Sequence, residues 1–490
     1  MNKFYGREMH FLKDFNGNPV AFDVKTSSVI YLNNLAQRIL SFGPEIGKKE
    51  VFHHCADDFS KSAINKTIRE LIDTGVLLKY PQKDDDLDMC NDDEAIIKGV
   101  SFNISHRCNM ACGYCFGGGG CYGGPRVDMK KSIVEAGLDI LFGTSDSSPR
   151  IVSFFGGEPF INWKVMRWTI EYAQSVANDR DIELMFFVTT NGTLLGADKL
   201  NFLNNKNIKL VISVDGPPEI HNKERKFLDG RGSYDVVENN VRLILKEYPN
   251  ISIQFRPTIT SYSCGKIKDI YRHFRLLGVN KMHFRPESKY GERSGLTLEE
   301  YQLLGLELEE LGVSMVDASD NGEYWGLVNI LKFLNILYFS ITRRDYCGAG
   351  ASIISISPDG SIYPCPRFTG SKEFLLGNVK SGIKNKKRNI LLDNSVDNRS
   401  DCNKCWARYI CGGGCLYMHW IANGDYKKND FMWCDWTRRS IETAIKVYAR
   451  LQENDENDKM REFFVRHTPL LSDFGEGANE LLTSILEERR

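Results

Sequence analysis

Apolar residues in the middle of the chain alternate between strand-like runs and stretches with helical spacing, which predicts strands and helices in turn. The predicted strands are Gly99–Ile104, Ile151–Phe155, Leu184–Thr189, Leu210–Val214, Ser252–Pro257 and Met282–Arg285. The predicted helices include Lys130–Phe142, Trp163–Ala177, Asp235–Lys246 and Gly265–Leu277. Six such units indicate an α/β fold with a parallel sheet, either doubly wound or curved into a barrel. A full barrel needs about 250 residues and only about 190 are available, so we expect a partial (β/α)6 TIM-like barrel.

Residues 1–80 carry a different pattern, that of a small α+β module. Val20–Val24 and Ser28–Leu32 are predicted as two short strands of a hairpin. An amphipathic helix that ends at Gly75 precedes a closing strand at Val76–Leu78, and its apolar face is formed by Ile64, Ile68, Leu71 and Ile72. The pattern predicts a winged-helix-like shape without a basic recognition helix. An exposed sheet edge in such a module could bind an extended peptide as an added strand, and a purely structural cap is the alternative.

The rest of the chain divides by composition. Residues 81–96 form a predicted linker, because Pro81–Glu94 is rich in acidic residues and nearly devoid of apolar ones. The predicted barrel and its bridging helices cover 97–340. Residues 341–435 are rich in glycine and cysteine with little periodicity, so we expect a small domain held together by metal rather than by a core. Residues 436–490 are predicted as terminal helices, the last of them at Asn479–Glu488.

Length and charge narrow the class of protein. The chain has 490 residues, more than one hydrophobic core normally covers, so we expect two or three domains. A net charge of −1 offers no electrostatic case for a nucleic-acid or membrane-surface partner. No apolar run reaches about 18 residues, and the first residues lack a signal-peptide pattern, so we expect a cytoplasmic protein. Fourteen cysteines in a reducing compartment then indicate metal or redox sites rather than disulfides.

Three cysteines with the spacing C-x3-C-x2-C follow the first predicted strand: Cys108, Cys112 and Cys115. In either fold, ligands bind at the carboxyl ends of the strands, which is where this loop lies. Three thiolates held this closely can each bind one iron of a cubane cluster and leave the fourth iron open to a small molecule. The glycine-rich run that follows and its Cys121 have no assigned role. The scattered Cys55, Cys90 and Cys264 are expected to be small buried hydrophobic residues.

Polar or glycine-bearing segments follow the next predicted strands. Glycines let the backbone approach a ligand closely, hydroxyl and amide groups suit a ribose or a carboxylate, and arginines pair with carboxylates. Taken singly, each of these residues is more often part of a turn or a surface charge. Together, at consecutive strand ends, they predict a site for one small zwitterionic, nucleoside-like ligand. They are Gly156, Gly157, Glu158, Thr190, Asn191, Gly192, Ser213, Asp215, Arg225 and Arg256.

Over residues 97–290 these segments resemble the radical S-adenosylmethionine (SAM) superfamily. The three cysteines match its cluster motif, with aromatic Tyr114 before the third, and Gly156–Pro159 resembles the Gly-Gly-Glu-Pro segment that receives the SAM amino group. Further positions near SAM are matched by Thr190, Asn191, Ser213, Asp215 and Arg225. The resemblance implies that SAM binds the fourth iron and is cleaved by one electron to methionine and a 5′-deoxyadenosyl radical, which takes a hydrogen from the substrate. An external reductant such as flavodoxin or ferredoxin is implied as a partner.

Seven more cysteines lie near the carboxyl end of the chain, where the C-x2-C and C-x3-C spacings alone could also indicate zinc. The whole run resembles the SPASM domain, which carries two auxiliary [4Fe–4S] clusters, so three clusters are implied in all. Family pairing places Cys402, Cys405, Cys411 and Cys434 on one fully ligated cluster, and Cys347, Cys365 and Cys415 on the other. Some relatives supply a fourth ligand from a cysteine between the first two positions, but none lies between Cys347 and Cys365. One iron of the cluster on Cys347, Cys365 and Cys415 could therefore lack a protein ligand. Alternatively, water or a side chain other than cysteine could bind that iron, and the sequence favours neither.

The whole arrangement most resembles the maturases of ribosomally made peptides that form thioethers, the sactipeptide and ranthipeptide (SCIFF-type) group. The resemblance implies that the N-terminal module binds the leader of the precursor peptide. A core cysteine would bind the first auxiliary cluster, while the radical removes a hydrogen from an acceptor residue. The alternatives are a carbon–carbon crosslinking or other SPASM-type peptide or protein maturase, a sulfatase-maturing enzyme, and a DNA-binding iron–sulfur regulator. Sulfatase-maturing enzymes carry an Asp base directly after the cysteine that matches Cys365, whereas Pro366 stands here.

Overall fold

The structure is a computed structural model that describes residues 3–80, 96–143, 148–289, 295–320 and 326–453. The predicted acidic linker and the predicted helix at Asn479–Glu488 lie outside these residues. Across the described ranges, the helices are too short or too polar for any of them to cross a membrane.

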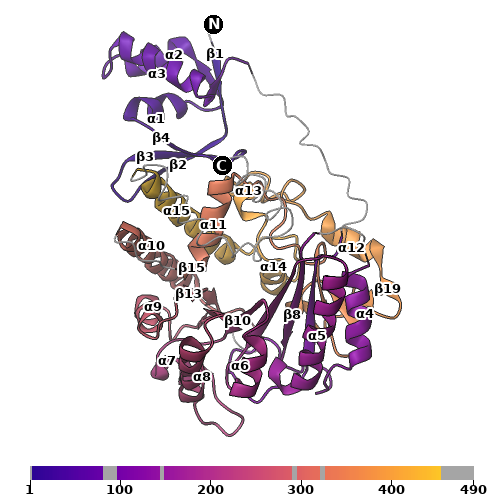
Figure 1. Cartoon of the computed structure of the whole chain (residues 1–490). Coiled ribbons are helices and arrows are strands. Elements are labelled where there is room, and N and C mark those ends of the chain that lie inside the picture. The colour runs from indigo at the N-terminus through magenta and orange to yellow at the C-terminus, as the bar shows by residue number, and fades with distance from the viewer. Residues whose placement is uncertain (1–2, 81–95, 144–147, 290–294, 321–325, 454–490) are drawn as a thin grey trace.

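A parallel sheet forms the centre of the molecule, and the predicted partial barrel is confirmed. Its six strands are hydrogen-bonded in the order β13-β11-β10-β9-β8-β7. They are β7 (Gly99–Ser105), β8 (Arg150–Gly156), β9 (Leu184–Thr190), β10 (Ile208–Ile212), β11 (Ser252–Phe255) and β13 (Lys281–Met282). Figure 1 shows α4, α5 and α6 along one face of this sheet. The helices of the barrel are α4 (Lys131–Leu141), α5 (Trp163–Asp179), α6 (Ala197–Leu203), α7 (Pro218–Glu224), α8 (Tyr234–Glu247) and α9 (Ile267–Leu276), with a short 3-10 turn, η1 (Pro159–Asn162), before α5.

The same sheet continues into the cysteine-rich segment, contrary to the expectation of a small domain without a core. Strand β16 (Ile353–Ile356) pairs in parallel with β7, so the first barrel strand lies between β8 and a strand from 250 residues further along the chain. Three antiparallel strands follow outward: β17 (Ser361–Tyr363), β18 (Gly377–Asn378) and β19 (Gly382–Ile383). Ile354, Ile356 and Ile362 are fully buried in the main hydrophobic core. Apolar burial therefore positions this segment on the barrel.

Long helices close the other edge of the barrel. Strand β15 (Gly326–Leu327) pairs with β13 and connects α10 (Leu298–Asp320) to α11 (Val328–Phe339). Both helices pack against α15 (Phe431–Glu453). This helix begins before the predicted boundary at residue 436 and carries Cys434 in its first turn. The remaining elements are β12 (Thr258–Ile259), β14 (Arg285–Pro286), η2 (Pro366–Phe368), α12 (Asn385–Leu392), α13 (Arg408–Cys411) and α14 (Leu416–Asn423).

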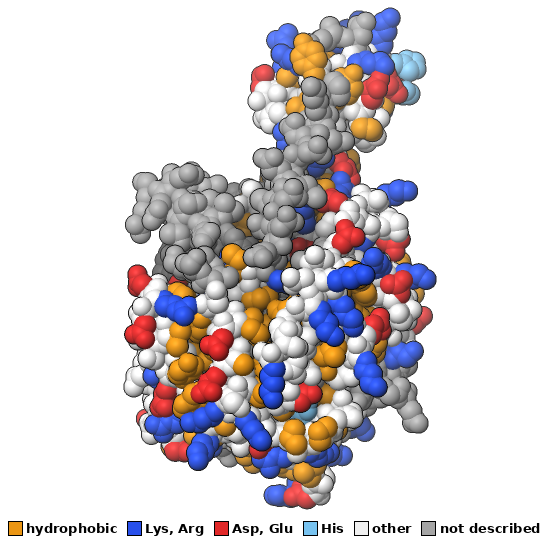
Figure 2. All heavy atoms as spheres, turned by 90° about the vertical axis from the view of Figure 1, so that its right-hand side faces the viewer, with side chains coloured by type: hydrophobic (Ala, Val, Ile, Leu, Met, Phe, Trp, Pro, Cys, Tyr) orange, Lys and Arg blue, Asp and Glu red, His pale blue; other side chains and the backbone are white. Residues whose placement is uncertain are grey.

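The N-terminal module protrudes as a lobe in Figure 2 and has a hydrophobic cluster of its own, while Val20, Phe22 and Val24 at its base belong to the main core. It contains two three-stranded sheets, β5-β1-β6 and β2-β3-β4, and three helices. The predicted hairpin, long helix and closing strand are β3–β4, α3 and β6. The elements are β1 (Lys3–Gly6), β2 (Met9–Lys13), β3 (Pro19–Asp23), β4 (Val29–Tyr31), α1 (Asn34–Leu40), β5 (Glu45–Gly47), α2 (Lys48–Cys55), α3 (Lys61–Asp73) and β6 (Leu77–Leu78). On the face drawn in Figure 2, basic and acidic side chains are interspersed.

The module contacts the cysteine-rich segment through the strand β2. The ring of His10 stacks on Trp406 with a centroid separation of 3.7 Å, and His10 Nε2 lies 3.1 Å from Oε1 of Glu442 on α15. Next to this stack, Nη1 of Arg408 donates to Oε1 of Glu8 over 2.7 Å. Trp406 directly follows Cys405 and Arg408 lies three residues after it, so the N-terminal sheet is attached to a cysteine-bearing segment.

Replacing His10 by alanine is expected to lower the free energy of unfolding by about 1 kcal/mol, because the stacked pair with Trp406 is lost. Thermal and denaturant unfolding of the full chain would measure the change. Lys13→Ala is the matched control, since Lys13 is an exposed residue of the same strand. Equal unfolding midpoints for both variants would show that the stack does not hold the module in place.

Candidate active site

The loop with Cys108, Cys112 and Cys115 lies at the carboxyl end of β7, as predicted. The three thiols lie within electrostatic range of one another. Burial, followed by the nearby charge of Glu158, raises the pKa of Cys108 to about 12. Burial also raises the pKa of Cys112, while Arg225 acts in the opposite direction. Three thiols in one loop at a strand end are a ligand set that suits an iron–sulfur cluster.

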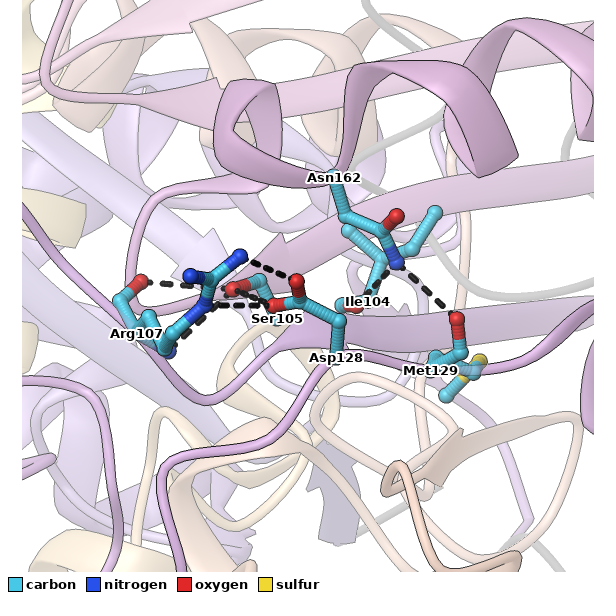
Figure 3. Close-up of polar contacts among 6 residues, drawn as sticks. All are labelled: Ile104, Ser105, Arg107, Asp128, Met129 and Asn162. Carbon is cyan, nitrogen blue, oxygen red and sulfur yellow. Dashed lines mark hydrogen bonds and ion pairs between the residues drawn. The ribbon is translucent and has the colours of Figure 1, made fainter.

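Both ends of this loop are held by polar side chains, shown in Figure 3. Ser105 Oγ donates to Oδ1 of Asp128 over 2.7 Å and accepts from the backbone N–H of Arg107 over 3.1 Å. The guanidinium of Arg107 forms an ion pair with the same carboxylate. On the other side of the segment, Nδ2 of Asn162 donates to the carbonyls of Ile104 and Met129. The strand end and the returning chain are thereby fixed to each other.

Two glycines allow the backbone of this loop to touch the end of β8. A Cβ on Gly157 would lie 2.2 Å from the carbonyl oxygen of Arg107, and one on Gly120 would lie 2.4 Å from Cα of Gly157. Because both neighbours are backbone atoms, neither could yield to a side chain. The glycine-rich run is therefore packed against the Gly-Gly segment. Its Tyr122 adds a hydrogen bond, donating from its hydroxyl to the carbonyl of Gly156 over 3.0 Å.

Gly157→Ala is expected to displace the cysteine loop and to reduce SAM-dependent activity by at least about tenfold, since a shift of the order of 1 Å has effects of that size. Iron content after anaerobic reconstitution and the affinity for SAM would both be measured. Gly124→Ala is the matched control, because a Cβ there would meet its nearest atom, the carbonyl oxygen of Cys121, only at 3.5 Å. Normal iron content and SAM affinity in the Gly157 variant would contradict the expected clash.

The carboxylate of Glu158 connects the ends of two neighbouring strands. Oε1 accepts from Oγ1 of Thr190 over 2.8 Å and from the N–H of Phe160 over 3.1 Å, and Oε2 accepts from the N–H of Asn191 over 2.8 Å. Glu158 is fully buried, and burial raises its pKa. Nδ2 of Asn191 donates to Oδ1 of Asn109 over 2.9 Å and lies 3.9 Å from Sγ of Cys108. The predicted segments after β8 and β9 thus meet at the cysteine loop.

A second buried network joins Tyr114, Asp215 and Arg225. The Tyr114 hydroxyl donates to Oδ2 of Asp215 over 2.5 Å and accepts from Nη1 of Arg225 over 2.7 Å. Oδ1 of Asp215 accepts from the N–H of Thr258 over 3.0 Å. This arrangement places a guanidinium beside Cys112 and fixes the aromatic residue of the cysteine motif. Ser213, another predicted residue, is partly exposed just after β10, and its N–H donates to the carbonyl of Thr190 over 2.9 Å.

The sequence did not predict the residues that hold Arg225 in this network. His221 is fully buried, and its Nε2 lies 2.9 Å from Oγ of Ser233, which donates to the carbonyl of Arg225 over 2.9 Å. Burial keeps the pKa of His221 well below its usual value, so the ring is neutral at pH 7. A single histidine on a helix carries no sequence signal for such a role. The arrangement fixes the backbone from which the Arg225 side chain extends.

The seven later cysteines form two groups, which we call the three-cysteine group and the four-cysteine group. The three-cysteine group is Cys347, Cys365 and Cys415, which lie within electrostatic range of one another. Burial raises the pKa of Cys347 to about 11 and that of Cys365 to about 12. The four-cysteine group is Cys402, Cys405, Cys411 and Cys434, which line one pocket. The structure thus brings together the cysteines of each set that the resemblance implied, and their role as cluster ligands stays a prediction.

Arg367 connects the three-cysteine group to the first cysteine loop. It lies two residues after Cys365, and its guanidinium carbon is 4.8 Å from the ring centroid of Phe116 and 5.2 Å from that of Tyr417. Phe116 directly follows Cys115, and Tyr417 lies two residues after Cys415. Tyr122 also lies within electrostatic range of Cys115, Cys365 and Arg367. The first loop and the three-cysteine group therefore face a shared region of the molecule.

The scattered cysteines take no part in these groups. Cys55 is fully buried in the N-terminal core, as expected, and the thiol of Cys264 donates to the carbonyl of Glu300 over 3.2 Å. Cys90 lies outside the described residues. Cys121 turns back into its own loop, where its thiol donates to the carbonyl of Gly118 over 3.2 Å. Through the described part of the chain, no three His, Cys, Asp or Glu side chains are arranged around a point that would suit a single metal ion.

Comparisons with known proteins agree with this geometry. A family model described as the Radical SAM superfamily matches residues 102–272. A cysteine-type anaerobic sulfatase-maturating enzyme of Clostridium perfringens is 26% identical over 333 residues, covering 64% of this chain and 86% of that protein. The subtilosin biosynthesis protein AlbA of Bacillus subtilis is 24% identical and covers 57% of both chains. The solved structure of anSMEcpe with bound AdoMet has a TM-score of 0.64 at 20% identity, covering 76% of this chain and 99% of its own.

A partial barrel with a cysteine loop at the end of its first strand defines the class of protein. The match over β7 to α9 identifies residues 102–272 as a radical SAM domain. Enzymes of this superfamily use SAM and a [4Fe–4S] cluster. The donor set fits both groups, because three partly buried thiols of one loop lie near a guanidinium and two close-packed glycines.

Proposed function

We propose that this enzyme modifies a ribosomally synthesised precursor peptide by forming thioether crosslinks between a cysteine sulfur and a carbon of an acceptor residue. The observation that carries the proposal is the three-cysteine group beside the first cysteine loop. Three thiolates leave one iron of a cubane cluster without a protein ligand, and a substrate thiolate can bind there. The four-cysteine group provides a complete ligand set for a third cluster.

Placement of the two groups supports this reaction. Arg367 lies against Phe116 of the first loop and within electrostatic range of Cys365 and Cys415. A peptide held between the loop and the three-cysteine group would have one residue near SAM and another near the open iron position. Bound SAM supplies the 5′-deoxyadenosyl radical that takes a hydrogen atom from the acceptor carbon. For each crosslink the sulfur gives up its proton and one electron passes to an oxidant, for which the auxiliary clusters are suited.

The N-terminal module offers a place for the leader of the precursor. Strand β4 is an edge strand of the sheet β2-β3-β4. A groove runs between this strand and α3, lined among others by Tyr31, Asn33, Glu70, Leu71 and Thr74. An extended leader peptide could add as a strand at this edge and place side chains in the groove. Besides the peptide, the enzyme would need a second partner, an external one-electron reductant.

Sulfatase maturation is the second candidate, favoured by the similarity to the Clostridium perfringens enzyme. Sulfatase-maturing enzymes carry an Asp base directly after the cysteine that matches Cys365. Here Pro366 begins the short helix η2, and no proton-accepting side chain stands at that position. Carbon–carbon crosslinking is a further alternative that the same fold would serve.

The test is mass spectrometry of a peptide modified by the reconstituted enzyme, using short cysteine-rich open reading frames adjacent to this gene as substrates. A thioether product loses two hydrogens for each crosslink and its cysteines no longer react with an alkylating reagent. A product that loses two hydrogens but keeps free thiols would replace this proposal by carbon–carbon crosslinking. Formation of an aldehyde on a sulfatase-derived peptide would replace it by sulfatase maturation.

A further inference from the structure

Two arginines stand beside the three-cysteine group, and they come from different parts of the chain. Arg285 belongs to β14 at the carboxyl end of the barrel, and Arg367 belongs to η2 in the cysteine-rich segment. Arg285 lies within electrostatic range of Cys347, and Arg367 within range of Cys365 and Cys415. The two guanidinium charges also act on each other. Both side chains are partly buried.

Neither guanidinium forms an ion pair with a carboxylate of the residues that the structure describes. The guanidinium carbon of Arg285 lies 4.9 Å from the ring centroid of Trp433, and Arg367 lies over Phe116 and Tyr417. Arg367 also makes a weak hydrogen bond, donating from Nη1 to Oγ of Ser288 over 3.5 Å. Aromatic faces stabilise a cation only by about 0.5–2 kcal/mol. Positive charge at this place is therefore only partly compensated by the protein.

The third nearby cation has a partner of its own. Arg343 also acts on Cys347, but the carboxylate of Asp345 lies within its electrostatic range. The carboxylate of Asp430 acts on Tyr301 as both guanidiniums do, but it forms no ion pair with either of them. Among the described residues, the cations beside the three-cysteine group without a carboxylate ion pair are thus Arg285 and Arg367. Three thiolates on an oxidised cubane leave roughly one net negative charge. Two guanidiniums exceed that charge, and one more anion in the same region would balance it.

We propose that Arg285 and Arg367 form a cationic subsite that holds an anionic side chain of the substrate peptide, the thiolate of its reacting cysteine, against the three-cysteine group. This inference rests on the proposed function and adds the residues that select the ionised form of the substrate. Arg285 and Arg367 act as positioning residues, because they would attract the thiolate without taking part in bond formation. A carboxylate has the same charge, but it would add no sulfur ligand to an open iron position.

The test uses the reconstituted full-length enzyme saturated with SAM, so that the open iron of the first cluster is occupied. N-acetyl-L-cysteine N-methylamide serves as the thiol probe, and the corresponding serine and aspartate compounds serve as neutral and carboxylate probes. The change in the electron paramagnetic resonance spectrum of the reduced auxiliary clusters, titrated with each probe, gives an apparent Kd. The midpoint potential of these clusters is measured in the same samples.

Arg285→Gln and Arg367→Gln are each expected to raise the apparent Kd for the thiol probe by about tenfold or more, because a unit charge near the sulfur is lost. Each variant should also lower the midpoint potential, since less positive charge stabilises the added electron. Arg367→Lys keeps the charge and should restore most of the affinity. Arg272→Gln removes a charge from the exposed face of α9 and should change neither quantity. Iron content and thermal midpoint identify any variant that fails to fold.

The possible failures are distinct. If the parent enzyme shows no thiol-dependent spectral change, the three-cysteine group has no open position and the proposed function fails. If the parent responds and both glutamine variants respond with the same Kd, only the role of the arginines is wrong. Tighter, arginine-dependent binding of the aspartate probe than of the thiol probe would also overturn the inference, because the subsite would then select carboxylates.

Discussion

Replacing Cys108, Cys112 and Cys115 together by alanine is expected to abolish production of 5′-deoxyadenosine from SAM. The three thiols lie within electrostatic range of one another in this loop. Without them the first cluster has no ligands and SAM has no iron to bind. Chromatography of reduced reaction mixtures would measure deoxyadenosine, and iron analysis should show a loss of about four irons per chain.

Cys121→Ala is the matched control for this experiment. Cys121 lies in the same loop, but its thiol donates to the carbonyl of Gly118. The variant should cleave SAM at the parental rate and keep its full iron content. Continued SAM cleavage by the triple variant would refute the assignment of the first cluster, and loss of cleavage in the Cys121 variant would extend the ligand set.

Replacing Cys365 by alanine is expected to separate the two halves of the reaction. SAM cleavage should continue, because Cys365 lies outside the first loop, while crosslinking of the peptide should fall by at least about a hundredfold. The reason is that two cysteines cannot hold the auxiliary cluster that binds the substrate sulfur in the proposed function. Deoxyadenosine and crosslinked peptide would be quantified in the same reaction by chromatography and mass spectrometry.

Cys264→Ala controls for the loss of a cysteine as such, since this partly buried thiol lies outside both cysteine groups and the first loop and donates to the carbonyl of Glu300. It should retain both activities. Crosslinking at the parental rate by the Cys365 variant would show that the three-cysteine group has no role in the chemistry. Loss of both activities would place Cys365 in the support of the first loop, which lies close to it through Tyr122.

Much of the barrel could be predicted from local patterns. A buried parallel strand such as β9 is a short apolar run, and an amphipathic helix such as α8 repeats its apolar residues every three to four positions. These patterns involve residues that are close in sequence, so they can be recognised without knowledge of the fold. The place of the local β16–β17 hairpin in the barrel sheet could not be predicted in this way, because β16 pairs with β7, which lies far earlier in the sequence.

In the candidate site, too, the sequence predicted some features and only the structure revealed others. Cysteine spacing and the residues after each strand predicted which side chains gather at the carboxyl end of the barrel, because parallel strands bring those ends to one edge. The roles of Glu158 and Asp215 as buried connectors emerged only from their hydrogen bonds. Tyr122 is an aromatic residue within a glycine-rich run. That unusual position is the sequence feature that could have indicated its hydrogen bond to Gly156.

By itself, the sequence determined the order of strands and helices, the loop of three thiols and the residues that follow each strand. These features follow from short-range spacing, which sets the geometry of a few consecutive residues. Only the tertiary structure decided that the cysteine-rich segment extends the barrel sheet, and that Arg285 and Arg367 meet beside Cys347, Cys365 and Cys415. Contacts of this kind depend on how segments far apart in the sequence bury their apolar faces against each other. A local sequence pattern does not determine the resulting distances.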